Sequence, residues 1–363
     1  MPPPVHLRVH GHHSLLTGVD SPQALLLCAA DLGYDTLALT DIDTGCGLVA
    51  FAQAAAQLGI HPIFGAELSD PQGRPGRIVA LVESELGYAN LCRLLSIRAL
   101  GGDPGRSGAQ LAGPTAARLA HECAAHAEGL IFLADHPRTL LELYGRVGTH
   151  QLYAAISSAA LSVKNTRHPP VTRPAKHVDF EPETWERARS DEERLDLPKP
   201  PAPDRPMTAQ ELIDAARSLG IATVAAPDVH CARPSGWHSQ RLRTAVKHAA
   251  LLEDLPEEWC APRPCHLHAP AEFTALYAAI DARAVDRTRE LADRCRWTPK
   301  LGRTLFPTLE LPPNETAYSR LATMAFAGAA QRYRPLKPEV VRRLDQELST
   351  IDSLGYAAYF LLV

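Results

Sequence analysis

The chain has 363 residues, of which 45% are hydrophobic and 21% are charged, as in an ordinary globular protein. Its formal net charge of −4 excludes a strongly basic nucleic-acid-binding chain, because no overall excess of lysine and arginine is available to neutralise phosphates. No apolar stretch approaches the length of a membrane span, and the first residues, MPPPVHL, lack the layout of a signal peptide. The eight cysteines are scattered, so we expect reduced thiols in a cytoplasmic protein.

The first hundred residues alternate short strands with helices. Ser21 and Pro22 begin one helix, because serine is a favourable N-cap and proline suits the first helical position. The pattern predicts strands at 6–10, 36–40, 62–65 and 78–82, and helices at 22–32, 48–58 and 88–99. Repeated units of this kind indicate parallel strands joined by right-handed crossovers. His10, Asp41 and Glu67 fall at or just after strand ends, where the active sites of α/β barrels gather.

The rest of the chain continues this alternation and then becomes helical. Strands are predicted at 130–134, 152–156 and 223–226, and helices at 115–128, 208–219, 240–252, 271–282, 285–295 and 315–333. Residues 164–206 contain many prolines and a charged run, which favours a long, exposed and flexible insertion. The final residues, AAYFLLV, predict an apolar strand, and an unpaired strand there indicates a chain cut short of its next domain.

Four short motifs carry the candidate functional residues. They are HLRVHGHHSLLTG from His6, Thr40-Asp41-Ile42-Asp43, Gly65-Ala66-Glu67, and Pro227-Asp228-Val229-His230. In order and spacing they resemble E-L-H-C-H-S-N-F-S-x-L-D-G, T-D-H-D, G-A-E and N-D-V-H, the motifs of the polymerase-and-histidinol-phosphatase (PHP) domain of bacterial C-family DNA polymerases. The segments GYANLCRLLS and LDQELSTIDSLGYAAYFLLV resemble the same family, so the resemblance covers nearly the whole chain outside 164–206.

This resemblance implies a fold and a domain order. We expect an α/β fold, a distorted (β/α)7 PHP barrel, at residues 1–235, followed by a mostly helical extension at 236–335. Residues 336–363 would be the truncated start of the polymerase palm. In its overall sequence features, the chain resembles the error-prone alpha-type polymerases more than the main replicative enzyme.

The resemblance also implies which residues would hold metal. The family ligands that the chain retains are His10, Glu67, Asp228 and His230, whereas other ligand positions hold Arg8, Thr17 and Ile42. Imidazole and carboxylate donors suit zinc or manganese, and the family uses two or three such ions to activate water and clamp a phosphate. The retained set is expected to hold one zinc or manganese ion at most, weakly or not at all. No catalytic residue is assigned.

Two alternatives concern the first two motifs. If two residues were deleted before LLTG, His10 and His12 would form the H-x-H pair of the family, at the cost of a gapless match. Asp41 and Asp43 could instead hold two metal ions as in a polymerase palm, although capping of the following turn is the favoured interpretation.

Two other patterns lie outside the motifs. Cys260, Cys265, His266 and His268 superficially resemble a zinc cluster, but their spacing fits no common zinc finger. One predicted helix carries a modest basic patch that could touch a nucleic-acid backbone, although a solvated face is favoured; its residues are Arg241, Arg243, Lys247 and His248.

Three hypotheses for function follow. The first is a degenerate PHP module at the front of an alpha-type DNA polymerase, acting in replication or repair, with the palm and fingers as partners and DNA touched only indirectly. The second is a metal-dependent phosphoesterase or 3′–5′ exonuclease of the PHP family. The third is a non-catalytic interaction module from a split polymerase gene. Because the palm carboxylates of the family follow the point where this chain ends, the chain alone is expected not to polymerise DNA.

Overall fold

The computed structural model describes residues 2–71, 73–100, 118–162, 208–302, 309 and 311–363. The chain divides into two compact units, Met1–Pro299 and Lys300–Val363. The predicted insertion at 164–206 lies outside the described residues. No described helix is both long enough and apolar enough to span a lipid bilayer.

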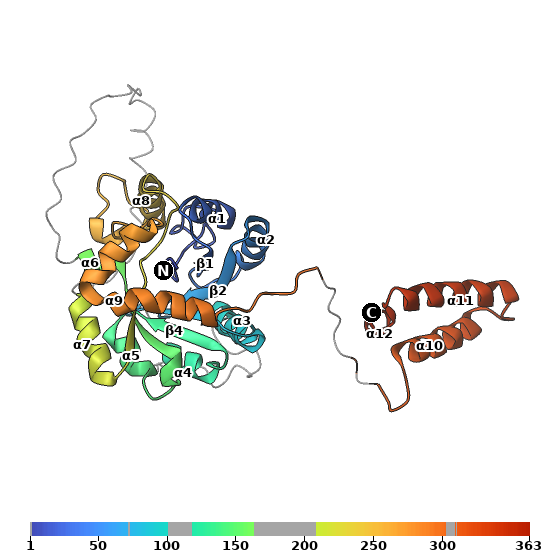
Figure 1. Ribbon diagram of the computed structural model, residues 1–363. Coiled ribbons are helices and arrows are strands. Elements are labelled where there is room, and N and C mark those ends of the chain that lie inside the picture. Colours follow the sequence, from blue (N-terminus) through green and yellow to red (C-terminus); the bar gives the residue numbers. More distant parts are fainter. Residues whose placement is uncertain (1, 72, 101–117, 163–207, 303–308, 310) are drawn as a thin grey trace, which may run out of the picture. The chain divides into compact units, whose positions relative to one another are not determined.

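A six-stranded mixed sheet forms the centre of the first unit (Figure 1). In spatial and chain order the strands are β1 (Thr36–Leu39), β2 (His61–Leu68), β3 (Ile78–Val82), β4 (Leu130–Ala134), β5 (Leu152–Ile156) and β6 (Ala222–Ala225). The pairs β1–β2, β4–β5 and β5–β6 are parallel, as the strand–helix alternation predicts.

Strand β3 departs from the expected parallel arrangement, because it runs antiparallel to both β2 and β4. The described residues between β2 and β3, 69–71 and 73–77, contain no helix. A parallel pair needs a crossover of a dozen or more residues, so this short connection returns the chain in the opposite direction. The reversal brings the beginning of β3, rather than its end, to the edge of the sheet that carries Glu67.

The N-terminal segment 6–10 closes the sheet into a barrel. On one side it accepts hydrogen bonds from β1 and the next residue: Ala38 N–H donates to His6 O at 3.1 Å, and Thr40 N–H donates to Val9 O at 2.8 Å. On the other side, His10 N–H donates to the carbonyl of Val229, just beyond β6, at 2.8 Å. The expectation of a distorted seven-stranded barrel is therefore confirmed, with an irregular segment in the seventh position.

Helices surround this barrel (Figure 1). They are α1 (Pro22–Asp31), α2 (Leu48–Leu58), α3 (Glu85–Leu100), α4 (Arg118–Ala125), α5 (Pro137–Leu143), α6 (Ser158–Ser162), α7 (Ala209–Leu219), α8 (Gly236–Lys247) and α9 (Pro270–Arg294). Short 3₁₀ turns lie at Thr149–Gln151 and Glu257–Trp259. The predicted cap of α1 is present, since the Ser21 side chain accepts a hydrogen bond from Ala24 N–H. Helix α9 joins the two helices predicted at 271–282 and 285–295 across non-helical Asp281.

The strands are buried on both faces. Along β3, Val79 and Leu81 belong to a cluster inside the barrel, while Ile78, Ala80 and Val82 belong to the larger cluster beneath the helices. The inner cluster also contains Leu291, Ala292 and Cys295, at the end of α9 and just beyond it, so this part of the chain covers one end of the barrel. Burial on two faces explains why these strands read as continuous apolar runs.

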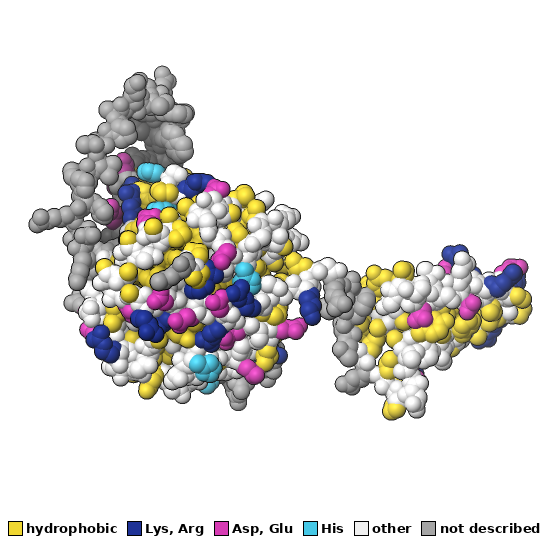
Figure 2. All heavy atoms as spheres, in the orientation of Figure 1, with side chains coloured by type: hydrophobic (Ala, Val, Ile, Leu, Met, Phe, Trp, Pro, Cys, Tyr) yellow, Lys and Arg dark blue, Asp and Glu magenta, His cyan; other side chains and the backbone are white. Residues whose placement is uncertain are grey.

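The described residues of the second unit form three helices: α10 (Ala317–Arg332), α11 (Pro338–Ser353) and α12 (Ala357–Leu362). The prediction of a terminal strand was wrong, because AAYFLLV forms α12 after Gly355, whose φ is 73°. A helix satisfies its backbone hydrogen bonds within itself, whereas a lone strand requires a neighbour. Large apolar side chains remain exposed on this unit (Figure 2); they include Met324, Tyr333, Leu354, Tyr359 and Phe360.

Candidate functional site

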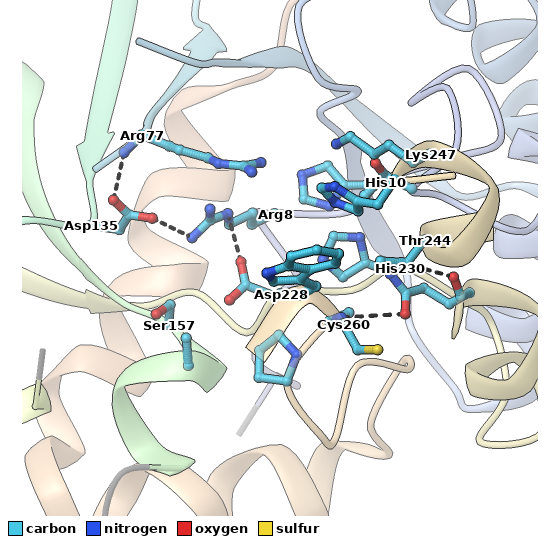
Figure 3. A pocket seen from close by; sticks show the side chains of 17 residues that line it. Arg8, His10, Arg77, Asp135, Ser157, Asp228, His230, Thr244, Lys247 and Cys260 are labelled. Atoms are coloured by element: carbon cyan, nitrogen blue, oxygen red, sulfur yellow. Dashed lines mark hydrogen bonds and ion pairs between the residues drawn. The ribbon is translucent and has the colours of Figure 1, made fainter. Parts of the chain in front are cut away.

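A polar pocket of about 280 Å³ opens at the mouth of the barrel (Figure 3). Its walls include chain segments far apart in sequence: the closing segment 6–10, the residue before β3, the residue after β4, the segments after β5 and β6, helix α8, and residues 259–262. Most of these are strand ends, which is where α/β barrels gather functional groups. Its ionisable lining residues include Arg8, His10, Arg77, Asp135, Asp228 and His230.

Arg8 is the central cation of this mouth. Its Nε lies 2.5 Å from Glu67 Oε2 and 2.8 Å from Asp228 Oδ1. Its Nη1 lies 3.0 Å from Asp135 Oδ2, an ion pair without hydrogen-bond geometry (Figure 3). The side chain is only 5% exposed. Burial alone lowers the pKa of Arg8, but the carboxylates of Asp228, Glu67 and Asp135 outweigh it and raise that pKa well above its ordinary value.

Glu67 is fully buried and receives three donors. They are Arg8, Arg77 and His10, whose Nε2 lies 3.1 Å from Glu67 Oε2. Burial raises the pKa of a carboxyl group, yet the attraction of Arg8, Arg77 and His10 is stronger and holds the pKa of Glu67 well below its usual range. Glu67 is therefore an ionised carboxylate whose charge the two arginines neutralise.

Asp228 shows the opposite shift although it pairs with the same arginine. Burial is the largest influence and raises the pKa of Asp228, and the nearby negative charges of Glu67 and Asp135 act in the same direction. Arg8 lowers this pKa but does not overcome the other influences. The difference arises because Glu67 pairs with two arginines. Among the described residues, Asp228 pairs with Arg8 alone and shares it with two other carboxylates.

The two retained histidines lie against each other at the mouth. The ring centroids of His10 and His230 are 4.6 Å apart, and the Nδ1 atom of each ring is buried without a hydrogen-bond partner. Burial, followed by the proximity of His10, lowers the pKa of His230 well below its ordinary value, so its ring is neutral. These two nitrogens are of a type that binds metal ions, but the carboxylates that would complete a metal site are bound to arginines.

The mouth therefore does not fit the metal centre that the resemblance implies. A divalent ion placed among His10, Glu67, Asp228 and His230 would lie beside the guanidinium of Arg8, and like charges at such distances repel. Within the part of the chain that the structure describes, these four side chains form no group of three mutually close ligand atoms. The carboxylates of the mouth neutralise arginines instead.

The other residues of the first two motifs have local roles. Asp41 Oδ1 accepts hydrogen bonds from Gly11 N–H at 2.7 Å and from Ser14 Oγ at 2.6 Å. Asp43 instead pairs with Arg98, Nε to Oδ1 at 2.5 Å. The two carboxylates thus serve separate partners. This arrangement is typical of structural aspartates in turns rather than of a shared two-metal site.

Three further positions of the first motifs carry no ligand at the mouth. Ile42 bridges Glu67 through its backbone, and Thr17 lines the pocket while its hydroxyl donates to the carbonyl of Leu15. His12, the ligand of the alternative register, is exposed, and its ring lies 4.3 Å from that of His13.

Arg77 and Asp135 are site residues that the sequence reasoning missed. Asp135 directly follows β4, as Asp41 closely follows β1, so its place after a predicted strand was an available signal. Arg77 precedes β3, and only the antiparallel direction of that strand brings it to the mouth. No local sequence pattern encodes that direction.

The four residues of the Cys/His pattern contact different partners. Cys265 Sγ lies 4.0 Å from Cys231 Sγ, and the thiol of Cys260 donates to the carbonyl of Pro256 at 3.8 Å. His266 and His268 instead approach the carboxylate of Glu272. The thiols of the two cysteines thus have different partners from the two histidine rings.

The basic patch on α8 is partly used inside the barrel unit. Arg243 donates to Gly18 O at 2.9 Å, and Arg241 donates to Leu252 O at 3.0 Å. The ring of His248 lies 4.5 Å from that of Trp259, and Lys247 lines the mouth pocket. On the face of the barrel unit shown in Figure 2, basic and acidic side chains are interspersed.

Comparison with known proteins finds relatives for nearly the whole chain. The family model described as "PHP domain" matches residues 6–168. The DNA polymerase III subunit alpha of Xylella fastidiosa strain Temecula1 is 28% identical over 382 residues, covering 99% of this chain and 29% of its own length. The error-prone DNA polymerase of Symbiobacterium thermophilum is 29% identical over 366 residues, covering 99% of this chain and 31% of its own length. The chain thus spans less than a third of the length of these relatives.

Among solved structures, one described as a metal-dependent phosphoesterase from Bifidobacterium adolescentis aligns with a TM-score of 0.33 and 14% identity, covering 83% of this chain and all of the other. An amidohydrolase from Chromobacterium violaceum aligns over 42% of this chain and 85% of its own, with a TM-score of 0.29 and 20% identity. Residues 6–168 thus match the PHP-domain family, and the chain resembles bacterial DNA polymerase III alpha subunits and error-prone DNA polymerases over nearly all of its length.

Proposed function

We propose that this chain is the PHP-containing part of a bacterial alpha-type DNA polymerase, replicative or error-prone, and works in the cytoplasm in DNA replication or repair. Within it the barrel is a non-catalytic module that supports the remaining polymerase and contacts DNA only through it. The similarity to two polymerases over 99% of the chain supports this assignment. The exposed apolar side chains of the unit Lys300–Val363 also favour a further protein surface packed against it, with palm and fingers as the partners.

One observation carries the non-catalytic part of the proposal: the position of Arg8 among Glu67, Asp135 and Asp228. Metal-assisted phosphoester hydrolysis needs carboxylates and imidazoles that are free to hold divalent ions, which in turn activate water and clamp the phosphate. A permanently charged guanidinium bound to these carboxylates supplies the compensating charge without coordinating water. Such a mouth stabilises the barrel and offers no activated nucleophile.

The activity test uses the purified chain with Zn²⁺ or Mn²⁺ and two substrates, p-nitrophenyl phosphate and a 3′-labelled single-stranded oligonucleotide. We expect no turnover above a metal-only blank. Hydrolysis that depends on metal and is lost in His230→Gln, with folding preserved by circular dichroism, would overturn the proposal in favour of a phosphoesterase or exonuclease.

The assignment to a polymerase is tested by sequencing the gene beyond the codon for Val363. An in-frame palm supports the proposal directly. A palm encoded by a separate gene would contradict the single-chain form and support a split subunit, in which this chain is an interaction module. Co-purification of the two gene products would then identify the partner.

A further inference from the structure

A second cluster of ligand-type side chains lies where the chain enters α9, and its residues are His266, His268 and Glu272. The Glu272 Oε1 atom lies 3.5 Å from His268 Nδ1 and 3.9 Å from His266 Nε2. The three ligand atoms are all within 4.8 Å of one another, the only such group of three or more in the described residues. The PHP motifs and the barrel mouth do not include these residues.

The chain fixes His268 before any ligand is present. The backbone N–H of His268 donates to His6 Nε2 at 3.2 Å, and the hydroxyl of Tyr34 donates to the carbonyl of His268 at 2.7 Å. Both backbone polar groups of His268 therefore bind buried side chains that lie more than 230 positions earlier in the sequence. The ring of His268 is 1% exposed, so its direction is set by packing.

The ring of His268 also carries an unsatisfied nitrogen. Its Nδ1 atom is buried without a hydrogen-bond partner and faces Glu272, whose separation of 3.5 Å is too long for a good hydrogen bond. A buried polar atom without a partner is costly, so such atoms in folded proteins call for a ligand or an ion that satisfies them. Here the orphaned atom is a metal-binding type and lies beside two further ligand atoms.

Among the described residues, no arginine or lysine competes for the carboxylate of Glu272. Within this part of the chain, its ion pairs are those with His266 and His268. The side chain of Glu272 is 47% exposed, which leaves one side of the cluster open to solvent. The group thus offers two imidazoles, one free carboxylate and an open fourth direction.

We propose that His266, His268 and Glu272 bind one zinc ion, with water in the fourth coordination position. Zinc binds imidazole and carboxylate at about 2.0–2.2 Å in tetrahedral geometry, which places neighbouring ligand atoms about 3.3 Å apart. The separations of 3.5 Å and 3.9 Å from Glu272 approach that value already. The ion ties the segment before α9 to the first turn of that helix, and α9 covers one end of the barrel.

The test uses the full chain, stripped of metal by a chelator and titrated with Zn²⁺ against a competing chromophoric chelator. We expect one tight site per chain, visible d–d bands of tetrahedral Co²⁺ in the substituted protein, and a rise in melting temperature on adding Zn²⁺. Glu272→Gln and His266→Gln should each weaken Zn²⁺ binding by at least about tenfold, since even loss of a residue behind a ligand costs that much. Both residues are accessible enough for the variants to fold, unlike buried His268.

The matched control is Glu85→Gln, because Glu85 is also an exposed glutamate in the first turn of a helix, α3. It should bind Zn²⁺ as the wild type does. The proposal is overturned if the wild type has no tight site, or if Glu272→Gln binds Zn²⁺ unchanged. It is equally overturned if Glu85→Gln loses as much affinity, or if His230→Gln loses the ion while Glu272→Gln keeps it.

Discussion

The barrel mouth and the cluster at the start of α9 contain the same kinds of side chain and are built in opposite ways. Each brings two histidines together with carboxylate. At the mouth, Arg8 and Arg77 are bound to the carboxylates. At the start of α9, the ion pairs of Glu272 within the described residues are those with the two histidines. The cation already bound to a carboxylate, more than the presence of ligand-type residues, therefore decides whether a metal can enter.

Burial explains why the two clusters differ in this way. Glu67 is fully buried, and an ionised carboxylate without compensation in such a place costs several kcal/mol, so a permanent cation must accompany it. Glu272 is 47% exposed, and water can solvate its charge until an ion binds. An arginine is thus obligatory for stability at the mouth and dispensable at the start of α9.

Among the substitutions that test this contrast, Arg8→Ala is expected to have the largest effect on the free energy of unfolding. The substitution leaves Glu67, Asp135 and Asp228 without their shared cation, and removing one partner of a buried ion pair costs about 3–5 kcal/mol. The free energy of unfolding, measured with urea, should fall by that amount. A loss below about 1 kcal/mol would show that the carboxylates do not depend on Arg8.

A double variant sharpens the same point. When Glu67→Gln is combined with Arg8→Met, both buried charges disappear together. The loss in free energy of unfolding of the double variant should therefore be about 1–3 kcal/mol smaller than the sum of the two single losses. Urea unfolding of all four proteins gives this coupling energy. Additive losses would indicate that the two side chains act independently.

Arg77→Ala should have a smaller effect. The Arg77 side chain pairs with Glu67 but is 40% exposed, so solvent screens the pair and replaces part of it. We expect the free energy of unfolding to fall by about 1 kcal/mol, less than for Arg8→Ala. An effect equal to that of Arg8→Ala would mean that both arginines are needed to hold Glu67 ionised.

The smallest effect belongs to the other cluster. In metal-free protein, Glu272→Gln should change the free energy of unfolding by no more than about 0.5 kcal/mol, because an exposed carboxylate loses only weak contacts with neutral histidines. Thermal unfolding in the presence of a chelator measures this. A loss comparable to that at the mouth would remove the contrast between the two clusters.

Local signals in the sequence predicted much of the barrel. Ser21 caps α1 as expected, and Gly220 ends α7 in the left-handed conformation. The direction of β3 was not predictable from its apolar pattern, which is the same for either direction, and Arg77 was missed for that reason. The run AAYFLLV was assigned to a strand because short apolar runs do not distinguish strand from helix.

The candidate site was predictable only where a motif named it. The departures at Arg8 and Ile42 were visible in the sequence, but the contacts of Arg8 with Asp135 and Asp228 depend on strands far apart along the chain. Glu272 gave no motif signal, because its relation to His266 arises at the junction of a loop and a helix. These contacts arise from the folding of the chain, and the spacing of residues along the sequence does not indicate them.

The closure of the barrel by its first residues has a consequence for how the protein is made. Val5 N–H donates to Thr288 Oγ1, a contact between residues 283 positions apart, and the segment 6–10 finds its partner beyond β6 only in the region around Val229. Such distant pairings close late, because the entropy of a long loop must be overcome first. During synthesis on the ribosome, this pairing cannot form until the region around Val229 has emerged, so one edge of segment 6–10 lacks its native partner until then. That interval is when a chaperone or a neighbouring nascent chain would find an open edge to bind.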